Sequence, residues 1–153
     1  MNRGREPFAQ EPPRPKIQVL FDPSKPDAAL FDTLAEEQAK QLEINSSQLR
    51  RFFGEIKDLY RQFNALTAGE VAEAKKQDVY KEKVEPRFKM MRSKVSYAKR
   101  AGGQAKLPEE FAEFLGESIR KVADHRQFVR FVLHLEAVVG FMYGMRKVTE
   151  KGR

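Results

Sequence analysis

The chain has 153 residues, a hydrophobic content of 41% and a formal net charge of +7. This length and composition predict one globular domain with a buried core. Cysteine is absent from the sequence, which excludes disulfides, thiolate metal sites and cysteine nucleophiles. The polar start does not resemble a signal peptide, and no apolar run approaches the ~20 residues of a membrane-spanning helix. We therefore expect a soluble, cytoplasmic protein.

Proline is concentrated at the start of the chain, where residues 1–26 hold six of the eight prolines. Proline lacks a backbone donor and interrupts helices, so residues 1–26 are predicted to form a flexible, disordered tail. Within this tail, residues 16–21 (KIQVLF) are mostly apolar. They are interpreted either as a docking segment or as a strap across the folded part. Residues 27–153 are predicted to form a single helical-bundle domain.

The first helix is predicted over residues 27–42, where Asp27 can serve as its cap. Its apolar positions share one face. That face consists of Leu30, Phe31, Leu34, Gln38 and Leu42. A second helix is predicted after Asn45, because Asn45 with Gln48 three residues later matches the capping-box pattern. We expect this helix to end near Leu66.

The second helix is predicted to have an apolar face and a basic face. The apolar face consists of Leu49, Phe52, Phe53, Ile56, Leu59, Tyr60 and Phe63. Arg50, Lys57 and Arg61 lie together on another face. This basic row is weakened by Glu55 and Asp58, which flank it. A solvated surface and an RNA contact are both open interpretations of the row.

Charged residues dominate the segment 70–85, which contains five acids and four lysines. The capping-box pattern recurs at residues 67–70, so a helix is expected to begin there. The segment has few apolar side chains to bury. It is therefore predicted to be a lightly anchored helix or a mobile connector.

The segment 86–108 contains seven basic residues and no acid, which equals the whole net charge of the chain. Its first part is patterned as a helix with a buried stripe on one side and cations on the other. The stripe consists of Phe88, Met91, Val95 and Ala98. Pro86 suits the first turn, and Gly102 and Gly103 are expected to end the helix. Tyr97 is assigned mainly to the core, with a ribose or base contact as the alternative.

Two more helices are predicted in the last third of the chain. Pro108 suits the first position of one of them, and its buried stripe consists of Phe111, Phe114, Leu115, Ile119 and Val122. The other, over residues 124–147, is apolar over most of its girth, which indicates a central position or a covering partner. Glu136 interrupts that apolar surface and needs an Arg or Lys partner. Gly140 and Gly144 are expected to form a packing notch.

These patterns predict an all-α fold, a compact bundle of about five helices without a strand. The two histidines, His125 and His134, are nine residues apart, which is not a metal-ligand spacing. No phosphate-binding glycine loop occurs, and the acids form no evident general acid–base pair. We therefore expect neither an enzyme nor a bound metal or cofactor. Cations on helices and apolar faces are features of a binding protein.

Three stretches resemble a known family. Residues 46–53 (SSQLRRFF) and 86–100 (PRFKMMRSKVSYAKR) are similar to two signatures of the small subunit of the type III-A CRISPR–Cas effector, the Csm complex. Phe131 with residues 135–139 (LEAVV) is a third, weaker match. The resemblance spans residues 28–145. The family usually has glycine at the position of Lys99.

The resemblance implies a non-catalytic helical bundle. Several copies would stack as a filament beside the backbone subunits that hold the guide RNA, in a complex with the large and other subunits. It also implies contact with the guide–target RNA duplex or the target strand, through phosphates and without base reading. The predicted RNA-binding residues are Arg50, Arg51, Lys57, Lys89, Arg92, Lys94, Lys99 and Arg100. Lys57 and Lys99 rest on helical spacing alone, whereas the other six match the two signatures.

Two other functions fit the same composition. A helical DNA-binding or nucleoid-type module would also present cations to phosphates, although no base-reading helix stands out. A protein-only assembly factor would instead place its basic face against an acidic partner. Competition between RNA and DNA duplexes distinguishes the first alternative, and binding that survives nuclease treatment would favour the second.

Overall fold

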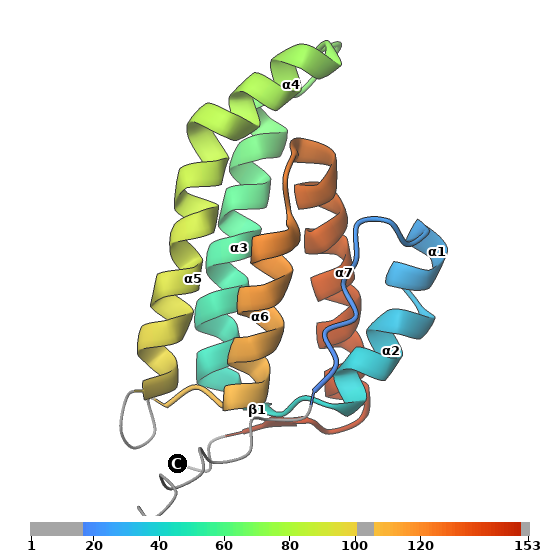
Figure 1. The fold of residues 1–153 in the computed structure, drawn as a ribbon, viewed down its shortest axis with the longest axis vertical. Coiled ribbons are helices and arrows are strands. Elements are labelled where there is room, and N and C mark those ends of the chain that lie inside the picture. Colours follow the sequence, from blue (N-terminus) through green and yellow to red (C-terminus); the bar gives the residue numbers. More distant parts are fainter. Residues whose placement is uncertain (1–16, 101–105, 151–153) are drawn as a thin grey trace, which may run out of the picture.

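The structure is a computed structural model, and it describes residues 17–100 and 106–150. Helices make up most of these residues. They form a bundle whose long helices run roughly side by side (Figure 1). The helices are α1 (Asp27–Leu30), α2 (Thr33–Lys40), α3 (Ser46–Leu66), α4 (Glu73–Val79), the π-helical turn η1 (Tyr80–Val84), α5 (Glu85–Arg100), α6 (Glu109–Lys121) and α7 (His125–Gly144). The predicted all-α bundle is confirmed.

A small parallel sheet was not predicted. Strand β1 (Ile44–Asn45) pairs with β2 (Val148–Thr149), and Ile44 lies opposite Val148. Two residues per strand are too few to produce an alternating pattern in the sequence. The pairing arises because the α2–α3 connection and the end of α7 meet at the same end of the bundle.

Residues 17–26 lie against the bundle as a strap, which was one of the two interpretations of residues 16–21, so the predicted flexible tail extends too far. Phe21 is fully buried and packs edge-to-face on Phe131, with ring centroids 5.3 Å apart. The backbone N–H of Leu20 donates to Oε1 of the buried Gln38 at 2.7 Å. Ile17 and Val19 also pack against the core, and Lys121 donates to the Phe21 carbonyl at 3.1 Å, so several contacts hold this proline-bearing stretch. Residues 1–16 lie outside the described residues.

The predicted helix over 27–42 is divided into α1 and α2. Asp27 does not cap it, because its carboxylate accepts a hydrogen bond from Arg130 of α7. Arg130 also donates to the backbone oxygens of Pro23 and Lys25. Both α1 and α2 pack against α7. Contacts with α7 therefore override the local pattern that favours one continuous helix.

The predicted start and end of α3 are confirmed. The Asn45 side chain accepts a hydrogen bond from the Gln48 N–H at 2.8 Å, and the helix ends at Leu66. The second capping-box prediction, at residues 67–70, is wrong. The Thr67 hydroxyl instead donates to the Phe63 carbonyl at 2.8 Å, and α4 starts only at Glu73.

From Glu73 onward, the charged segment is helical and runs through α4 and η1 into the basic helix α5 without a break. Tyr80 and Val84 in η1 are fully buried, so this segment is anchored more firmly than its composition predicted. At its outer end, the Glu73 carboxylate accepts a hydrogen bond from Arg126 of α7 at 3.0 Å. The wider π turn ends at Val84, two residues before Pro86, whose ring would clash with a carbonyl in an ordinary α-helical turn.

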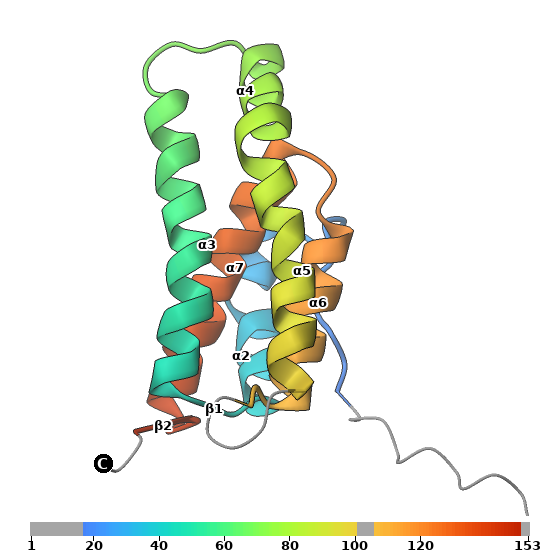
Figure 2. The ribbon, with the colours of Figure 1, turned by 90° about the vertical axis from the view of Figure 1, so that its left-hand side faces the viewer.

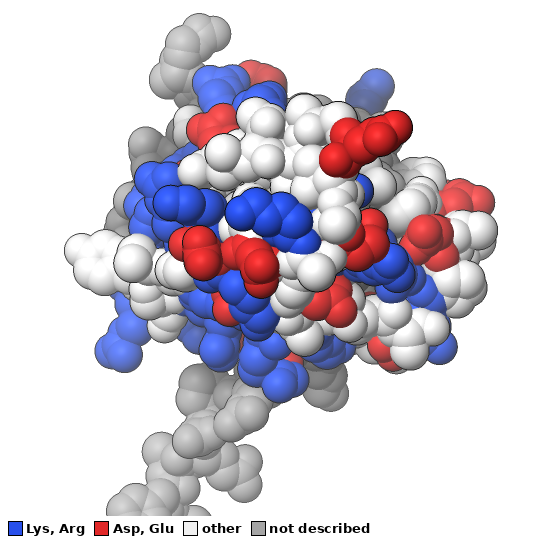
Figure 3. Space-filling model, turned by 90° about the horizontal axis from the view of Figure 1, so that it is seen from above, with Lys and Arg blue, Asp and Glu red and all other residues white. Residues whose placement is uncertain are grey.

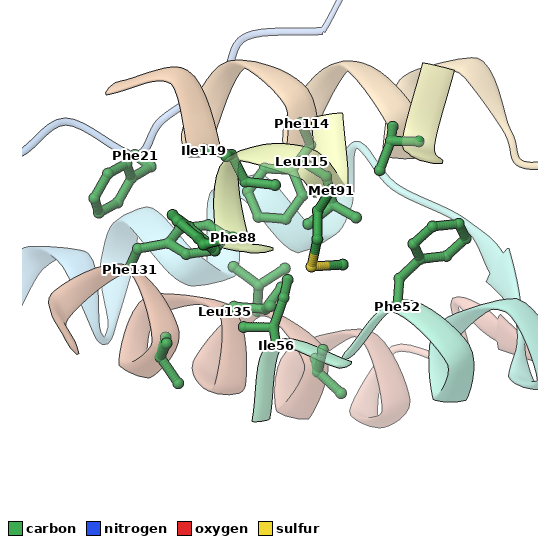
Figure 4. Packing of buried hydrophobic residues seen from close by; sticks show 14 of the residues in the cluster. Phe21, Phe52, Ile56, Phe88, Met91, Phe114, Leu115, Ile119, Phe131 and Leu135 are labelled. Carbon is green, nitrogen blue, oxygen red and sulfur yellow. The ribbon is translucent and has the colours of Figure 1, made fainter. Parts of the chain in front are cut away.

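The buried stripes predicted for α3, α5, α6 and α7 meet in one core. Figure 4 shows their side chains converging together with Phe21 of the strap. Phe88 of α5 packs edge-to-face on Phe128 of α7, with ring centroids 4.9 Å apart. Every predicted stripe residue of α5 and α6 is buried. Periodic spacing thus identified the core faces correctly.

Among the described residues, Gly140 and Gly144 of α7 form no packing notch, whereas His134 has a structural role. A Cβ atom added at Gly140 or Gly144 would have no described neighbour within 4 Å. No other described segment packs closely against these glycines, so the predicted packing notch is wrong within residues 17–100 and 106–150. His134 is fully buried, and its Nδ1 lies 2.6 Å from the Leu30 carbonyl oxygen. Because a carbonyl only accepts, Nδ1 carries the proton and His134 is a structural link from α7 to α1.

Candidate nucleic-acid interface

The basic helix α5 lies on the outside of the bundle, beside both α3 and α6 (Figure 2). Its predicted stripe is buried against the core, so the remaining residues form the outer surface of the helix. Some of these residues face α6 and others face α3. A third set, which includes the exposed Tyr97, points away from both neighbouring helices. The surroundings of the cations differ among these three sets.

The side of α5 that faces α6 carries Arg92, Ser96 and Lys99, which line a shallow hollow of about 160 Å³. Glu113 and Glu117 of α6 line the opposite side. Glu117 binds Arg120 of its own helix at 2.8 Å, and this hydrogen bond lowers the pKa of Glu117. Within residues 17–100 and 106–150, neither Arg92 nor Lys99 forms an ion pair, so both charges remain available.

The side of α5 that faces α3 lines a groove of about 410 Å³ with Arg87, Met90 and Lys94. Lys94 Nζ lies 2.9 Å from Glu55 Oε2 of α3. Both side chains are more than one third exposed, and such surface ion pairs contribute only about 0–1 kcal/mol. A phosphate can therefore compete with Glu55 for Lys94.

Lys89 has a structural role that the spacing did not predict. Its Nζ donates to the backbone oxygens of Ile119 at 2.7 Å and Val122 at 2.6 Å. These carbonyls are at the C-terminus of α6, where a cation also complements the helix dipole. Burial lowers the pKa of Lys89. Because the Lys89 ammonium already donates to two carbonyls of the protein, it is not free to bind a phosphate.

The predicted basic residues of α3 do not share one surface. Lys57 forms an ion pair with Glu136 of α7, which confirms that Glu136 needs a basic partner on a neighbouring helix. Its ammonium also lies 5.5 Å from the Tyr60 ring centroid. Arg50 and Arg51 are exposed near the start of α3. α3 starts at the end of the bundle where α5 finishes (Figure 1), so these two arginines and the last residues of α5 lie at the same end.

A comparison with models of protein families matches residues 25–144 to Csm2 Type III-A. The chain belongs to the Csm2 family. It is thus a small subunit of a type III-A CRISPR complex and associates there with other Csm subunits. Neither a comparison with curated proteins nor one with solved structures gives a match.

For a Csm2 subunit, the distribution of charge matters more than its total. Figure 3 shows the molecule from the α4 end, with the side that carries α5 on the left, as in Figure 1. Basic side chains gather towards this left side. Elsewhere on this end, acidic and basic side chains are interspersed (Figure 3). An interspersed surface has a weak net field, so the side of α5 is the better candidate for a polyanion.

Besides Lys57 and Lys89, sequence reasoning misplaced Tyr97 and left Arg87 out of the candidate surface of this Csm2 chain. Tyr97 is 78% exposed, so its assignment to the core is wrong. Arg87 lines the same groove as Lys94. Its position seven residues before Lys94, two helical turns away, is the signal that would have found it.

No feature of the described residues points to a metal or a membrane. Among residues 17–100 and 106–150, no group of three or more His, Asp or Glu side chains is arranged to hold a metal ion. No helix in these ranges has the length and apolar character needed to cross a bilayer. The absence of catalysis and of a cofactor stays a prediction.

Proposed function

We propose that this Csm2 subunit binds the phosphates of the target RNA, or of the guide–target duplex, along the outer surface of α5. The observation that carries the proposal is that Arg92, Lys99 and Arg100 form no ion pair with any described residue. Among the described residues, Glu113 and Glu117 line the same hollow as Arg92 and Lys99 but form no ion pair with them, so a phosphate has no ion pair to break there. Arg50 and Arg51 extend the proposed surface at the same end of the bundle, and Lys94 contributes if a phosphate replaces Glu55.

Two of the residues predicted from the sequence are left out of this proposed surface. Lys57 is paired with Glu136, and Lys89 donates to the end of α6. Withdrawing either ammonium would leave buried or half-buried polar groups without partners, which costs free energy. Lysine and arginine contacts to phosphates carry no base information. Choice of target is therefore left to the guide strand.

The proposal includes stacking of several copies as a filament beside the subunits that hold the guide. Support comes from the outer face of α7, where Val129, Leu133 and Ala137 are only half-buried and Gly140 is open. In Figure 1, α5 lies at the left margin of the bundle, whereas α7 lies between α6 and α2. Protein contacts through α7 would leave α5 accessible to RNA. We expect the assembled complex to act in the cytoplasm.

A salt series of RNA binding tests the phosphate contacts. The variant Arg92→Glu with Arg100→Glu changes two exposed residues without an ion pair among the described residues, so the fold should persist. Each lost phosphate contact should flatten the slope of log K against log salt by about 0.7–0.9. Filter binding of an RNA duplex and of a single strand gives both slopes.

The matched control is Lys40→Glu with Arg61→Glu. It changes the net charge equally, but both residues lie outside α5 and are already paired with Glu37 and Asp58. It should alter affinity slightly and leave the slope unchanged. Equal slopes for the wild-type protein and the α5 variant would refute the proposal.

A further inference from the structure

The outermost row of α5 has no charged side chain before Arg100 at its end, although the helix as a whole is basic. Met90, Ser93 and Tyr97 follow one another at spacings of three and four residues, so they share one face. Met90 is 57% exposed and Tyr97 is 78% exposed. Exposed methionine and tyrosine side chains in one row leave apolar surface in contact with water, which a bound partner would cover.

Cations flank this row on both sides. Arg87 and Lys94 line the groove towards α3, at the edge of which Met90 lies, and Glu55 and Asp58 line its other side. Arg92 and Lys99 line the hollow towards α6, opposite Glu113 and Glu117. A polyanion held by both flanks would lie across the row. The parts of the polyanion that meet Tyr97 would be those between its phosphates. For RNA, these parts are riboses and bases.

The row offers an aromatic face rather than a set of hydrogen-bond donors. The Ser93 hydroxyl donates to the Met90 carbonyl at 2.9 Å, so its proton is used within the helix. Stacking of a base on an aromatic ring tolerates any sequence, because every base has a π-face. In a duplex, neighbouring base pairs cover these faces. An exposed aromatic ring therefore suits an unpaired base.

We infer that Tyr97, with Met90 beside it, stacks on an unpaired nucleobase of RNA held by the cations of α5. This inference rests on the proposed function and adds a preference for single-stranded or locally unpaired RNA. Tyrosine, methionine and arginine are also enriched in protein interfaces, whereas lysine is depleted there. Lys94 and Lys99 beside the row therefore favour RNA over a protein partner. Here the apolar row is one residue wide and lies between cations.

The test of stacking uses the absence of tryptophan from the chain. Tyr97→Trp introduces a single tryptophan at the proposed stacking position, and Tyr143→Trp introduces one on α7, where Tyr143 is 54% exposed. Addition of single-stranded RNA should quench the emission of the first variant and leave that of the second unchanged. Equal quenching at both positions, or none at either, would overturn the inference.

Affinity provides an independent measurement with the full chain at low salt. Tyr97→Ala should weaken binding of single-stranded RNA about tenfold, equivalent to about 1.4 kcal/mol. Tyr97→Phe should bind like the wild-type protein, because the ring is retained. Duplex binding should change less than twofold in either variant. A loss in Tyr97→Ala that is equal for single strand and duplex would overturn the preference for unpaired bases.

The two proposals fail in different ways. If the wild-type chain binds RNA with a normal salt slope and Tyr97→Ala binds equally well, stacking is refuted and the phosphate surface stands. If the wild-type chain has no affinity for either RNA, both proposals are refuted. If Tyr97→Ala instead loses association with other Csm subunits while RNA binding is intact, the row contacts protein and the inference is wrong.

Discussion

Replacing Lys89 with methionine tests whether this cation supports the fold or binds RNA. Methionine keeps most of the apolar stem and removes the ammonium that donates to Ile119 and Val122. A hydrogen bond from a charged donor contributes about 1.5–3 kcal/mol. Water can recover part of this at a helix end, and burial already penalises the charge of Lys89. We therefore expect a loss of about 2–3 kcal/mol in the free energy of unfolding.

Urea unfolding followed by circular dichroism measures that loss, and thermal unfolding should show a decrease of roughly 5–10 °C in Tm. Lys99→Met is the matched control, because Lys99 is on the same helix but donates no hydrogen bond to a described residue. Its stability should change by less than about 0.5 kcal/mol. The salt slope of RNA binding should flatten for Lys99→Met only. Unchanged stability with a flattened slope in Lys89→Met would refute the structural role of Lys89.

Three further predictions concern contacts between distant segments. Burial lowers the pKa of His134 in the native state, so below about pH 6.5 the unfolded chain binds more protons than the native chain. The free energy of unfolding should therefore decrease as the pH is lowered, by at most about 1.4 kcal/mol per pH unit. Unfolding curves of His134→Gln should lack this component, and parallel pH profiles would contradict it. Phe21→Ala should cost about 3–4 kcal/mol, and a cost below about 1 kcal/mol would show that the strap does not support the fold. A double-mutant cycle of Lys57→Met and Glu136→Gln should give a coupling of about 1 kcal/mol, whereas zero coupling would mean that the pair is not formed in solution.

The elements that the sequence predicted well depend on neighbours within one or two turns. Asn45 caps α3 and Asp124 caps α7, each by accepting a hydrogen bond from a backbone N–H three residues later. The buried stripes of α5 and α6 follow the helical repeat. The family motifs lie in these same helices. Local patterns were therefore sufficient for the fold class and the family.

The candidate site was only partly predictable, because charge pairing depends on distant residues. Lys57 pairs with a residue 79 positions away, Lys94 with one 39 positions away, and Lys89 donates to carbonyls 30 and 33 positions away. No spacing on a single helix reveals such partners. In the sequence these lysines resemble Arg92, which has no ion-pair partner among the described residues.

The sequence by itself determined the helical class, the start and end of α3, the core faces and the membership of the Csm2 family, because each is set by local periodicity, capping or a short motif. Tertiary structure decided that residues 17–26 are a strap and not a docking segment, and it alone decided the division of α1 from α2, the small sheet and the exposure of Tyr97. The physical reason is that these features follow from which surfaces meet. A buried ring such as Phe21 or a shared guanidinium such as Arg130 joins segments about 100 residues apart, and its energy outweighs the weak preferences of the local chain.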